Sequence, residues 1–325
     1  MVKPKKESDI KIAQYSESLQ LIDNSDDFFK GVMLCLINIK SLKDFIIGEK
    51  IRTDIDCTVT KYLYYIKNDL WYSNDEKTMN NLYFDFKEYI KNHNYNRNHS
   101  NKIFIKPYLL IHFIILRLYN ENVIKQLFIP FGKEEELNNK EIKKLFFFEL
   151  NLFYICKNCG EHNQNYEDCC LEIQLQENNI KNDIVDLVKI MFEDDTTCIH
   201  CGKKVTAKRK MLNISKYLII VINNDDVKRI NTYKIEKSID LTDIYRANIF
   251  SKTNYKLVSF IYDRKFVYHL LNKDWFIYDI IHSFNNLDDQ RILYKRNILP
   301  KQLEMKKEFP EEINNFPAIL IYELK

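Results

Sequence analysis

Four cysteines in two matching pairs offer the clearest chemistry in the sequence. They form Cys156-x-x-Cys159-Gly160 and Cys198-x-x-Cys201-Gly202, two copies of one Cys-x-x-Cys-Gly motif. The two-residue spacing lets both thiolates of a pair point at one ion, while the glycine takes the turn that follows. We therefore expect the four cysteines to bind one Zn²⁺ ion. This site is structural, because four thiolates leave no open coordination position for water.

Other interpretations of these cysteines are disulfides or ordinary buried thiols, but neither requires two copies of one motif with glycine in the same place. His162 and His200 are alternative ligands. Cys169 and Cys170 lie between the pairs, and adjacent cysteines cannot easily both turn inward on one ion. We therefore interpret these two as strand residues. Free thiolates fit a reducing compartment, which predicts a location in the nucleus or cytoplasm.

The segments around the two motifs carry secondary-structure patterns. A helix-like segment at Lys140–Phe146 precedes the strand-like Phe148–Ile155, which leads into the first motif. Between the motifs, Cys170–Gln176 alternates as a strand does, and Asp183–Phe192 repeats apolar residues at helical spacing. We therefore expect the zinc to lie at the tips of strands and to join the two ends of a structured segment between the motifs.

Helices are predicted to dominate the first half of the chain. Residues 1–20 are charged and are expected to form a loose tail. Phe28–Ile39 has the spacing of a buried helix, with Asp26 or Asp27 at its N-terminus. Lys61–Asn92 fits two amphipathic helices, and Leu109–Leu118 fits a core helix that is too short to span a bilayer.

Strands are predicted for the second half. Five apolar segments fit one mainly antiparallel sheet: Lys216–Ile222, Tyr255–Ile261, Phe266–Leu271, Trp275–Tyr278 and Ala318–Tyr322. A chain of 325 residues with 46% apolar residues can form one large domain or two smaller ones. Because these strands need the preceding helices as a second layer, we predict one α+β domain.

Charge and hydropathy exclude some classes of protein. The 49 basic and 46 acidic residues are intermixed and give a net charge of only +3, which argues against a dedicated nucleic-acid binder. The first seven residues are too polar for a signal peptide, and the longest apolar run, Tyr108–Tyr119, is interrupted by His112 and Arg117. The sequence therefore predicts a soluble protein with no membrane partner.

The order of these features resembles the ubiquitin-specific protease family from about Asn24 to Glu323. Leu212–Val221 is similar to a strand of that family, Ile239–Tyr245 to its Leu-Asp-Leu-x-x-Tyr motif, and Trp275–Asp279 to its Trp-aromatic-x-aromatic-Asp motif. The resemblance implies a papain-like α+β fold over residues 21–325. In such a fold a helical thumb spans about 22–135, zinc-tipped fingers about 145–205 and an antiparallel-sheet palm about 205–325.

Members of the family are thiol proteases, and the resemblance locates their catalytic positions in this chain. Asp27 stands at the cysteine nucleophile, Lys265 at the histidine base, Ile280 at the residue that orients the histidine, and Ser25 at the asparagine that stabilises the oxyanion. A carboxylate is a poor substitute for a thiolate, lysine with a pKa near about 10 is not a base at neutral pH, and isoleucine cannot accept a proton. The resemblance therefore implies a catalytically inactive member of the family.

The favoured function is a pseudoenzyme that acts as a zinc-stabilised binding module or scaffold in a protein or ribonucleoprotein assembly. An aspartate in place of the cysteine also occurs in the inactive, spliceosome-associated branch of the family, which implies mRNA splicing and the nucleus. That branch usually carries an additional N-terminal zinc-finger module and generally lacks the double cysteine motif. Ubiquitin is a candidate partner, although Arg264 and Lys265 bring bulk and charge where the family accommodates the diglycine tail.

Two alternative functions remain. In the first, the protein is an active thiol protease with a rearranged site, formed by Cys35 or Cys57 with His269 or His282. In the second, it is a zinc-dependent nucleic-acid-binding protein that uses the basic cluster of Lys203, Lys204, Lys208, Arg209 and Lys210. For the scaffold, any contact with nucleic acid is indirect.

Overall fold

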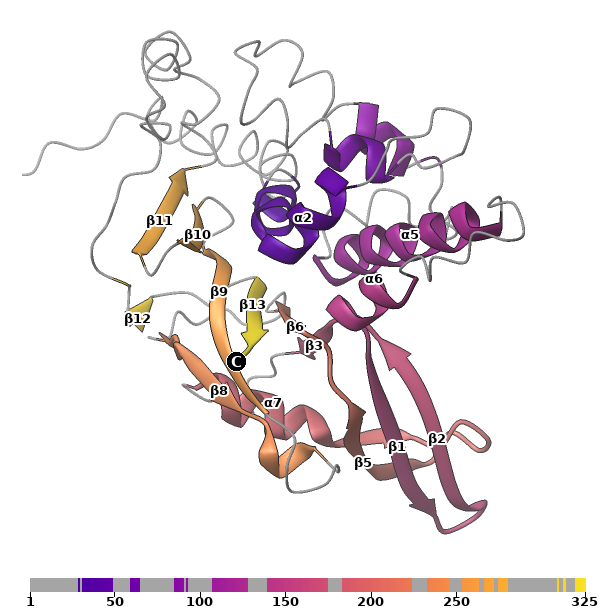
Figure 1. Ribbon diagram of the computed structural model, residues 1–325. Coiled ribbons are helices and arrows are strands. Elements are labelled where there is room, and N and C mark those ends of the chain that lie inside the picture. Colours follow the sequence, from indigo (N-terminus) through magenta and orange to yellow (C-terminus); the bar gives the residue numbers. More distant parts are fainter. Residues whose placement is uncertain are drawn as a thin grey trace, which may run out of the picture.

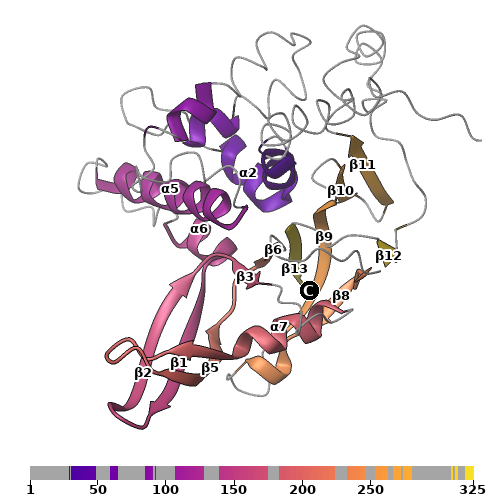
Figure 2. The ribbon, with the colours of Figure 1, turned by 180° about the vertical axis from the view of Figure 1, so that it is seen from behind.

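The computed structural model describes most of the chain from the first helix to the C-terminus. The described residues are 29, 31–48, 59–64, 85–90, 92, 107–127, 139–174, 183–223, 233–245, 253–262, 266–271, 274–279, 309, 312–313 and 319–325. Figures 1 and 2 show three parts from opposite sides: a group of helices, a central sheet, and a second sheet that projects away from both. The predicted α+β class is confirmed.

The helical part contains residues 31–38, 59–64 and 85–90 together with the helices α2 (Lys40–Gly48), α5 (Pro107–Leu127) and α6 (Asn139–Phe146). Pro107 suits the first turn of α5, where its missing N–H would have no partner within the helix. Leu110, Ile114 and Leu118 follow at helical spacing and are buried. The predicted core helix is therefore confirmed. None of the helices that the structure describes is both long enough and apolar enough to cross a membrane.

A buried carboxylate links two of these helical segments. Glu121 of α5 is 3% exposed. Its Oε1 accepts a hydrogen bond from Val59 N at 2.7 Å, and its Oε2 accepts bonds from Thr60 N at 2.9 Å and Thr60 Oγ1 at 2.7 Å. Val59 and Thr60 are the first residues of the described helical stretch 59–64, where backbone N–H groups lack partners within a helix. Glu121 therefore satisfies donors that would otherwise be buried without a partner.

The central sheet has seven strands, with β11, β10, β9, β13, β6 and β3 side by side and β8 paired with β9. Their bounds are β3 (Leu171–Gln174), β6 (Tyr217–Asn223), β8 (Ser238–Asp240), β9 (Asn254–Tyr262), β10 (Phe266–Leu271), β11 (Asp274–Asp279) and β13 (Ile319–Leu324). All pairs are antiparallel except β3 with β6. The prediction of a mainly antiparallel sheet over these segments is confirmed. A separate pair, β7 (Tyr233–Lys234) and β12 (Glu312–Ile313), lies beside it.

Both faces of the central sheet are covered. Successive side chains of a strand point to opposite faces. In β6, Ile219 and Val221 belong to the buried cluster formed with the helical part, whereas Leu218 and Ile220 belong to a second buried cluster. That second cluster includes buried residues of α7 (Ile184–Phe192). The helices before the cysteine motifs thus supply one layer and the segment between the motifs supplies part of the other.

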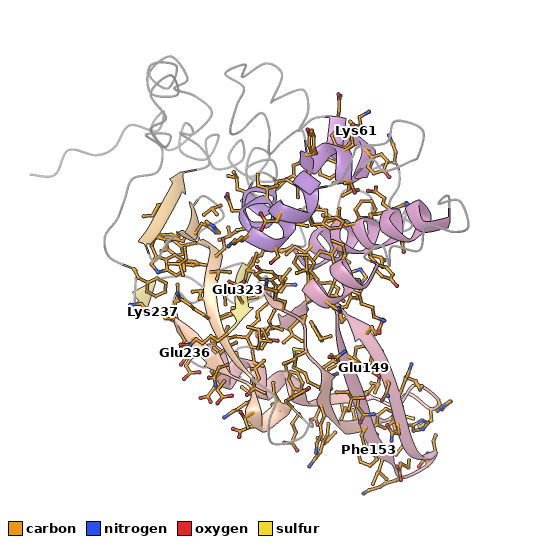
Figure 3. All side chains as sticks on the ribbon, in the orientation of Figure 1. Lys61, Glu149, Phe153, Glu236, Lys237 and Glu323 are labelled. Atoms are coloured by element: carbon orange, nitrogen blue, oxygen red, sulfur yellow. The ribbon has the colours of Figure 1, made fainter. Side chains whose placement is uncertain are left out.

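Polar contacts join the sheet to its neighbours at the end of β13. The Tyr217 hydroxyl donates to Glu323 Oε1 at 2.8 Å, near the C-terminus (Figure 3). Lys216 Nζ donates to Ser41 Oγ at 2.6 Å, and the Tyr217 hydroxyl lies 3.1 Å from the same oxygen. These contacts fix α2 against the start of β6.

The projecting sheet has the order β2-β1-β5-β4. Its strands are β1 (Phe148–Cys156), β2 (Gly160–Asp168), β4 (Glu193–Thr197) and β5 (Lys204–Asn213). The interpretation of Cys169 and Cys170 as strand residues is wrong, since both lie in a bend between β2 and β3. Asp168 Oδ1 accepts hydrogen bonds from the N–H groups of Cys169 at 2.7 Å and Cys170 at 3.4 Å, and an aspartate that bonds its following backbone turns the chain.

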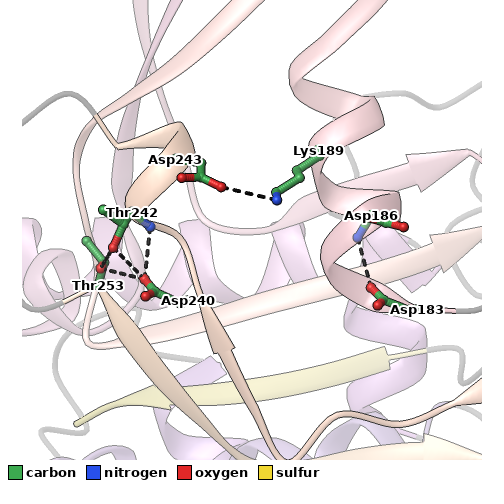
Figure 4. Close-up of polar contacts among 7 residues, drawn as sticks. All are labelled: Asp183, Asp186, Lys189, Asp240, Thr242, Asp243 and Thr253. Atoms are coloured by element: carbon green, nitrogen blue, oxygen red, sulfur yellow. Dashed lines mark hydrogen bonds and ion pairs between the residues drawn. The ribbon is translucent and has the colours of Figure 1, made fainter.

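The segment Ile239–Tyr245 packs against α7, as Figure 4 shows. Lys189 Nζ of α7 lies 3.1 Å from Asp243 Oδ2. Asp240 Oδ1 accepts hydrogen bonds from Thr242 N at 3.0 Å, Thr242 Oγ1 at 2.6 Å and Thr253 Oγ1 at 2.8 Å. Asp240 therefore closes the turn that follows β8 and fastens it to the start of β9.

Candidate functional site

The structure brings the four predicted cysteines together at the tip of the projecting sheet. Cys156 ends β1 and Cys159 closes the turn to β2, while Cys198 and Cys201 lie in the turn between β4 and β5. Their four Sγ atoms all lie within 4.8 Å of one another, and Cys156 Sγ is 3.6 Å from Cys201 Sγ. Tetrahedral Zn–S bonds of about 2.3 Å separate sulfurs by about 3.8 Å, whereas a disulfide requires about 2.05 Å. The cysteines therefore fit a zinc ion and are not paired in disulfides.

The glycine of each motif occupies the same backbone position. Gly160 has φ of 84° and Gly202 has φ of 68°. This left-handed region is accessible to glycine without the steric cost that a Cβ atom brings. In the second turn, Gly202 N donates to Cys198 O at 2.8 Å. The predicted role of the glycines is confirmed.

Hydrogen bonds and burial shift the pKa values of three of the four thiols, those of Cys156, Cys159 and Cys198. Amide N–H groups of Asn158 and Cys159 lower the pKa of Cys156. Burial raises the pKa of Cys198, but hydrogen bonds from the amides of His200 and Cys201 and from the side chains of Cys201 and Cys156 together outweigh it, and the pKa falls to about 6. The hydrogen bond with Cys201, followed by burial, raises the pKa of Cys159 to about 12. Binding of a cation by all four sulfurs would therefore require loss of the Cys159 proton.

The two histidines considered as alternative ligands lie beside the cysteine cluster. His162 stacks between Tyr154, at a ring distance of 4.7 Å, and His200, at 4.5 Å. Tyr154 also accepts a hydrogen bond from Ile199 N at 3.3 Å. The aromatic stack supports the turns that carry the cysteines.

The four predicted positions of the protease site, Ser25, Asp27, Lys265 and Ile280, lie outside the described residues, as do Cys57 and His282. Some of their neighbours in the chain are described. Phe266 and Asp279 are paired across β10 and β11. Phe29 belongs to the same buried cluster as Val267 of β10. Phe29 and Val267 thus lie in the buried cluster that joins the helical part to the central sheet.

Cys35, the other candidate nucleophile, is buried in this contact. Its Sγ lies 3.3 Å from the Ser259 hydroxyl, which donates to Tyr268 O at 2.9 Å. Ser259 of β9 is the register partner of His269 on β10, and both are buried. Burial raises the pKa of Cys35 to about 12, despite the opposing hydrogen bond from Ser259. Cys35 is therefore a protonated thiol at neutral pH, which is a poor nucleophile.

Ser259 was not predicted to contact Cys35. Its strand was predicted, but the partner of a side chain across the sheet–helix contact depends on tertiary packing. The alternation of β9 could have indicated which face Ser259 occupies, though not that Cys35 lies opposite.

The basic cluster after the second motif faces acidic groups. Lys208 Nζ lies 3.3 Å from Glu193 Oε1, and Arg209 Nη1 donates to Met191 O at 2.8 Å. β4, which pairs with β5, also carries Asp195, whose Oδ1 accepts a hydrogen bond from Thr206. This arrangement reduces the positive field that a nucleic-acid site needs.

A helical thumb, a central palm sheet and projecting fingers with a cysteine cluster at their tip define the fold of the ubiquitin-specific proteases. The chain has this fold. Similarity to solved structures supports the assignment, whereas no protein-family model and no curated protein matches the sequence.

The solved structures that match include several of the SAGA DUB module containing Ubp8, Sgf11, Sus1 and Sgf73. A structure of the module with a variant Ubp8 matches with a TM-score of 0.57 at 12% identity, and the match covers 92% of this chain and 67% of the matched chain. A module bound to ubiquitin aldehyde has a TM-score of 0.55 at 12% identity, with 93% and 68% covered. The yeast module with a variant Sgf73 gives 0.55 at 12% identity, with 93% and 67% covered. At this identity the similarity defines the fold.

Proposed function

We propose that the protein is a catalytically inactive relative of the deubiquitinases, which acts as a zinc-stabilised binding module or scaffold in a larger assembly. The observation that carries the proposal is the set of residues at the protease positions of the sequence: Asp27, Lys265 and Ile280. An acid, an ammonium and a hydrocarbon cannot generate a thiolate nucleophile and a neutral general base. Ser25 in the oxyanion position agrees with this loss.

The surroundings of Cys35 support the proposal. A replacement nucleophile has to be ionisable and accessible to substrate. Cys35 is 1% exposed and its pKa is raised to about 12 by burial, so it meets neither requirement. Cys35 therefore does not replace the missing nucleophile of a thiol protease.

Cys156, Cys159, Cys198 and Cys201 would hold the zinc ion of the proposed scaffold. When bound, the ion supplies cross-linking of the two turns at the tip of the fingers. The residues themselves order the site: amides hold the sulfurs, the glycines close the turns, and the aromatic stack supports them. The fingers thereby present a rigid surface to a partner.

The solved structures with this fold support protein partners, because they are of a four-protein module, bound to ubiquitin aldehyde in one case and to monoubiquitin in another. We propose that this chain also works inside a protein or ribonucleoprotein assembly, the splicing machinery included, in the nucleus or cytoplasm. Ubiquitin itself remains a candidate ligand of the palm and fingers.

A ubiquitin probe with a C-terminal electrophile tests the loss of activity. We expect no covalent adduct with the full chain under conditions that label an active deubiquitinase completely. An adduct that disappears in Cys35→Ser or Cys57→Ser would overturn the proposal by identifying a working nucleophile. Binding of unmodified ubiquitin, followed in parallel by calorimetry, separates retained recognition from retained chemistry.

A further inference from the structure

A second group of potential metal ligands lies where the fingers meet the thumb. His112 of α5, Asp168 at the end of β2 and Cys169 in the following bend each offer one ligand atom, and these atoms lie within 4.8 Å of one another. We propose that these three residues bind a second metal ion, a divalent ion of the zinc class. The site is separate from the four cysteines, which lie at the opposite end of β2.

The donor set selects the kind of metal. Imidazole nitrogen, thiolate sulfur and carboxylate oxygen together suit Zn²⁺ and similar transition metals, whereas Mg²⁺ and Ca²⁺ prefer oxygen ligands. His112 Nε2 lies 4.0 Å from Asp168 Oδ1, which is too long for a hydrogen bond. Tetrahedral bonds of about 2.1 Å require a separation of about 3.4 Å, so these two side chains have to approach by about half an ångström. The His112 side chain is 38% exposed and has room to make this adjustment.

Hydrogen bonds already orient the carboxylate of this group. Asp168 Oδ1 accepts bonds from the N–H groups of Cys169 and Cys170, and the Tyr108 hydroxyl donates to Asp168 Oδ2 at 3.3 Å. Partners of this kind fix the orientation of ligating side chains in metal sites. Tyr108 and His112, one turn apart on α5, also stack with a ring distance of 5.6 Å.

Hydrogen bonds explain the position of only one of the three residues. The bonds from the two amides and from Tyr108 explain the position of Asp168. They do not hold the imidazole of His112, which lies 4.0 Å from Asp168 Oδ1, or the thiol of Cys169. A metal ion joins all three, ties α5 to the base of the fingers, and leaves a further coordination position for water or a donor from a partner.

Zinc stoichiometry tests the proposal. The full chain is dialysed against Zn²⁺ buffered by a competing chelator, and zinc per chain is measured by inductively coupled plasma mass spectrometry. We expect two zinc ions in the wild type and one in His112→Ala. Cys35→Ser, which removes a buried thiol elsewhere in the thumb, is the matched control and should keep two.

One zinc ion per wild-type chain, or two in His112→Ala, would overturn the second site. Because His112 is partly exposed, its replacement should leave the fold intact, and circular dichroism checks this. Cys169→Ser provides an independent variant, for which we expect the second ion to be lost at a chelator concentration that leaves the wild type loaded. Retention of that ion at the same chelator concentration would also count against the site.

Discussion

Replacement of Glu121 should destabilise the thumb far more than replacement of a surface glutamate. In Glu121→Ala, two backbone N–H groups and the hydroxyl of Thr60 lose their acceptor inside the protein. Hydrogen bonds to a charged group contribute about 1.5–3 kcal/mol each, but such losses are not additive. We therefore expect the free energy of unfolding to fall by roughly 3–5 kcal/mol, against a total of about 5–15 kcal/mol for a typical domain.

Glu121→Gln should have a smaller effect, because one oxygen acceptor is retained while the new amide NH₂ group faces a backbone N–H. A loss of about 1–3 kcal/mol is expected. The matched control is Glu193→Ala, whose side chain is 62% exposed beside Lys208. Removal of an exposed pair of this kind costs at most about 1 kcal/mol.

Urea unfolding in the presence of zinc, followed by intrinsic fluorescence, measures these differences. With an m-value of about 3 kcal/mol per molar, Glu121→Ala should lower the midpoint by about 1–1.7 M. If Glu121→Ala and Glu193→Ala shift the midpoint equally, the buried carboxylate does not hold the two helical segments together and the reasoning fails.

Two further predictions concern the fingers and the palm. Cys156→Ser should lower zinc content and thermal stability together, and an unchanged zinc stoichiometry in both Cys156→Ser and Cys198→Ser would refute the four-cysteine site. The pKa of Asp240 is lowered by hydrogen bonds from Thr242, then Thr253. Its stabilising effect is therefore present above the ordinary pKa of about 3.9 and lost as pH falls through the folded value. Asp240→Asn should reduce stability at pH 7 by less than about 1 kcal/mol, a difference that should shrink below about pH 4 and that urea titrations at both pH values would measure.

Local patterns in the sequence were sufficient to predict the cysteine cluster, β1 and most strands of the central sheet, but not β2, β4 and β5 of the projecting sheet. Each Cys-x-x-Cys-Gly motif fits within five residues, so its turn is determined by neighbours in the chain. The strands β9 and β10 were predicted nearly to their observed ends, because their apolar residues form short continuous runs.

Contacts between distant segments could not be predicted in the same way. Glu121 bonds to Thr60, which lies 61 positions earlier, and no local pattern marks a glutamate as buried. Asp168 reaches His112 only because β2 ends beside α5. The strand interpretation of Cys169 and Cys170 failed because the apolar run that begins there concealed the turn made by the preceding aspartate.

The parallel pairing of β3 with β6 means that an ion bound by the cysteines at the tip of the fingers would also affect the central sheet. The chain leaves the first cysteine motif, runs down the fingers, enters the palm as β3, forms α7 and returns to the second motif. An ion bound at the tip would therefore close a loop of residues 160–197. Within this loop, β3 belongs to the central sheet. Loop closure removes entropy from the unfolded chain. We therefore expect removal of the metal by a chelator to destabilise β3 and α7, at the edge of the central sheet and far from the sulfurs, as well as the tip of the fingers.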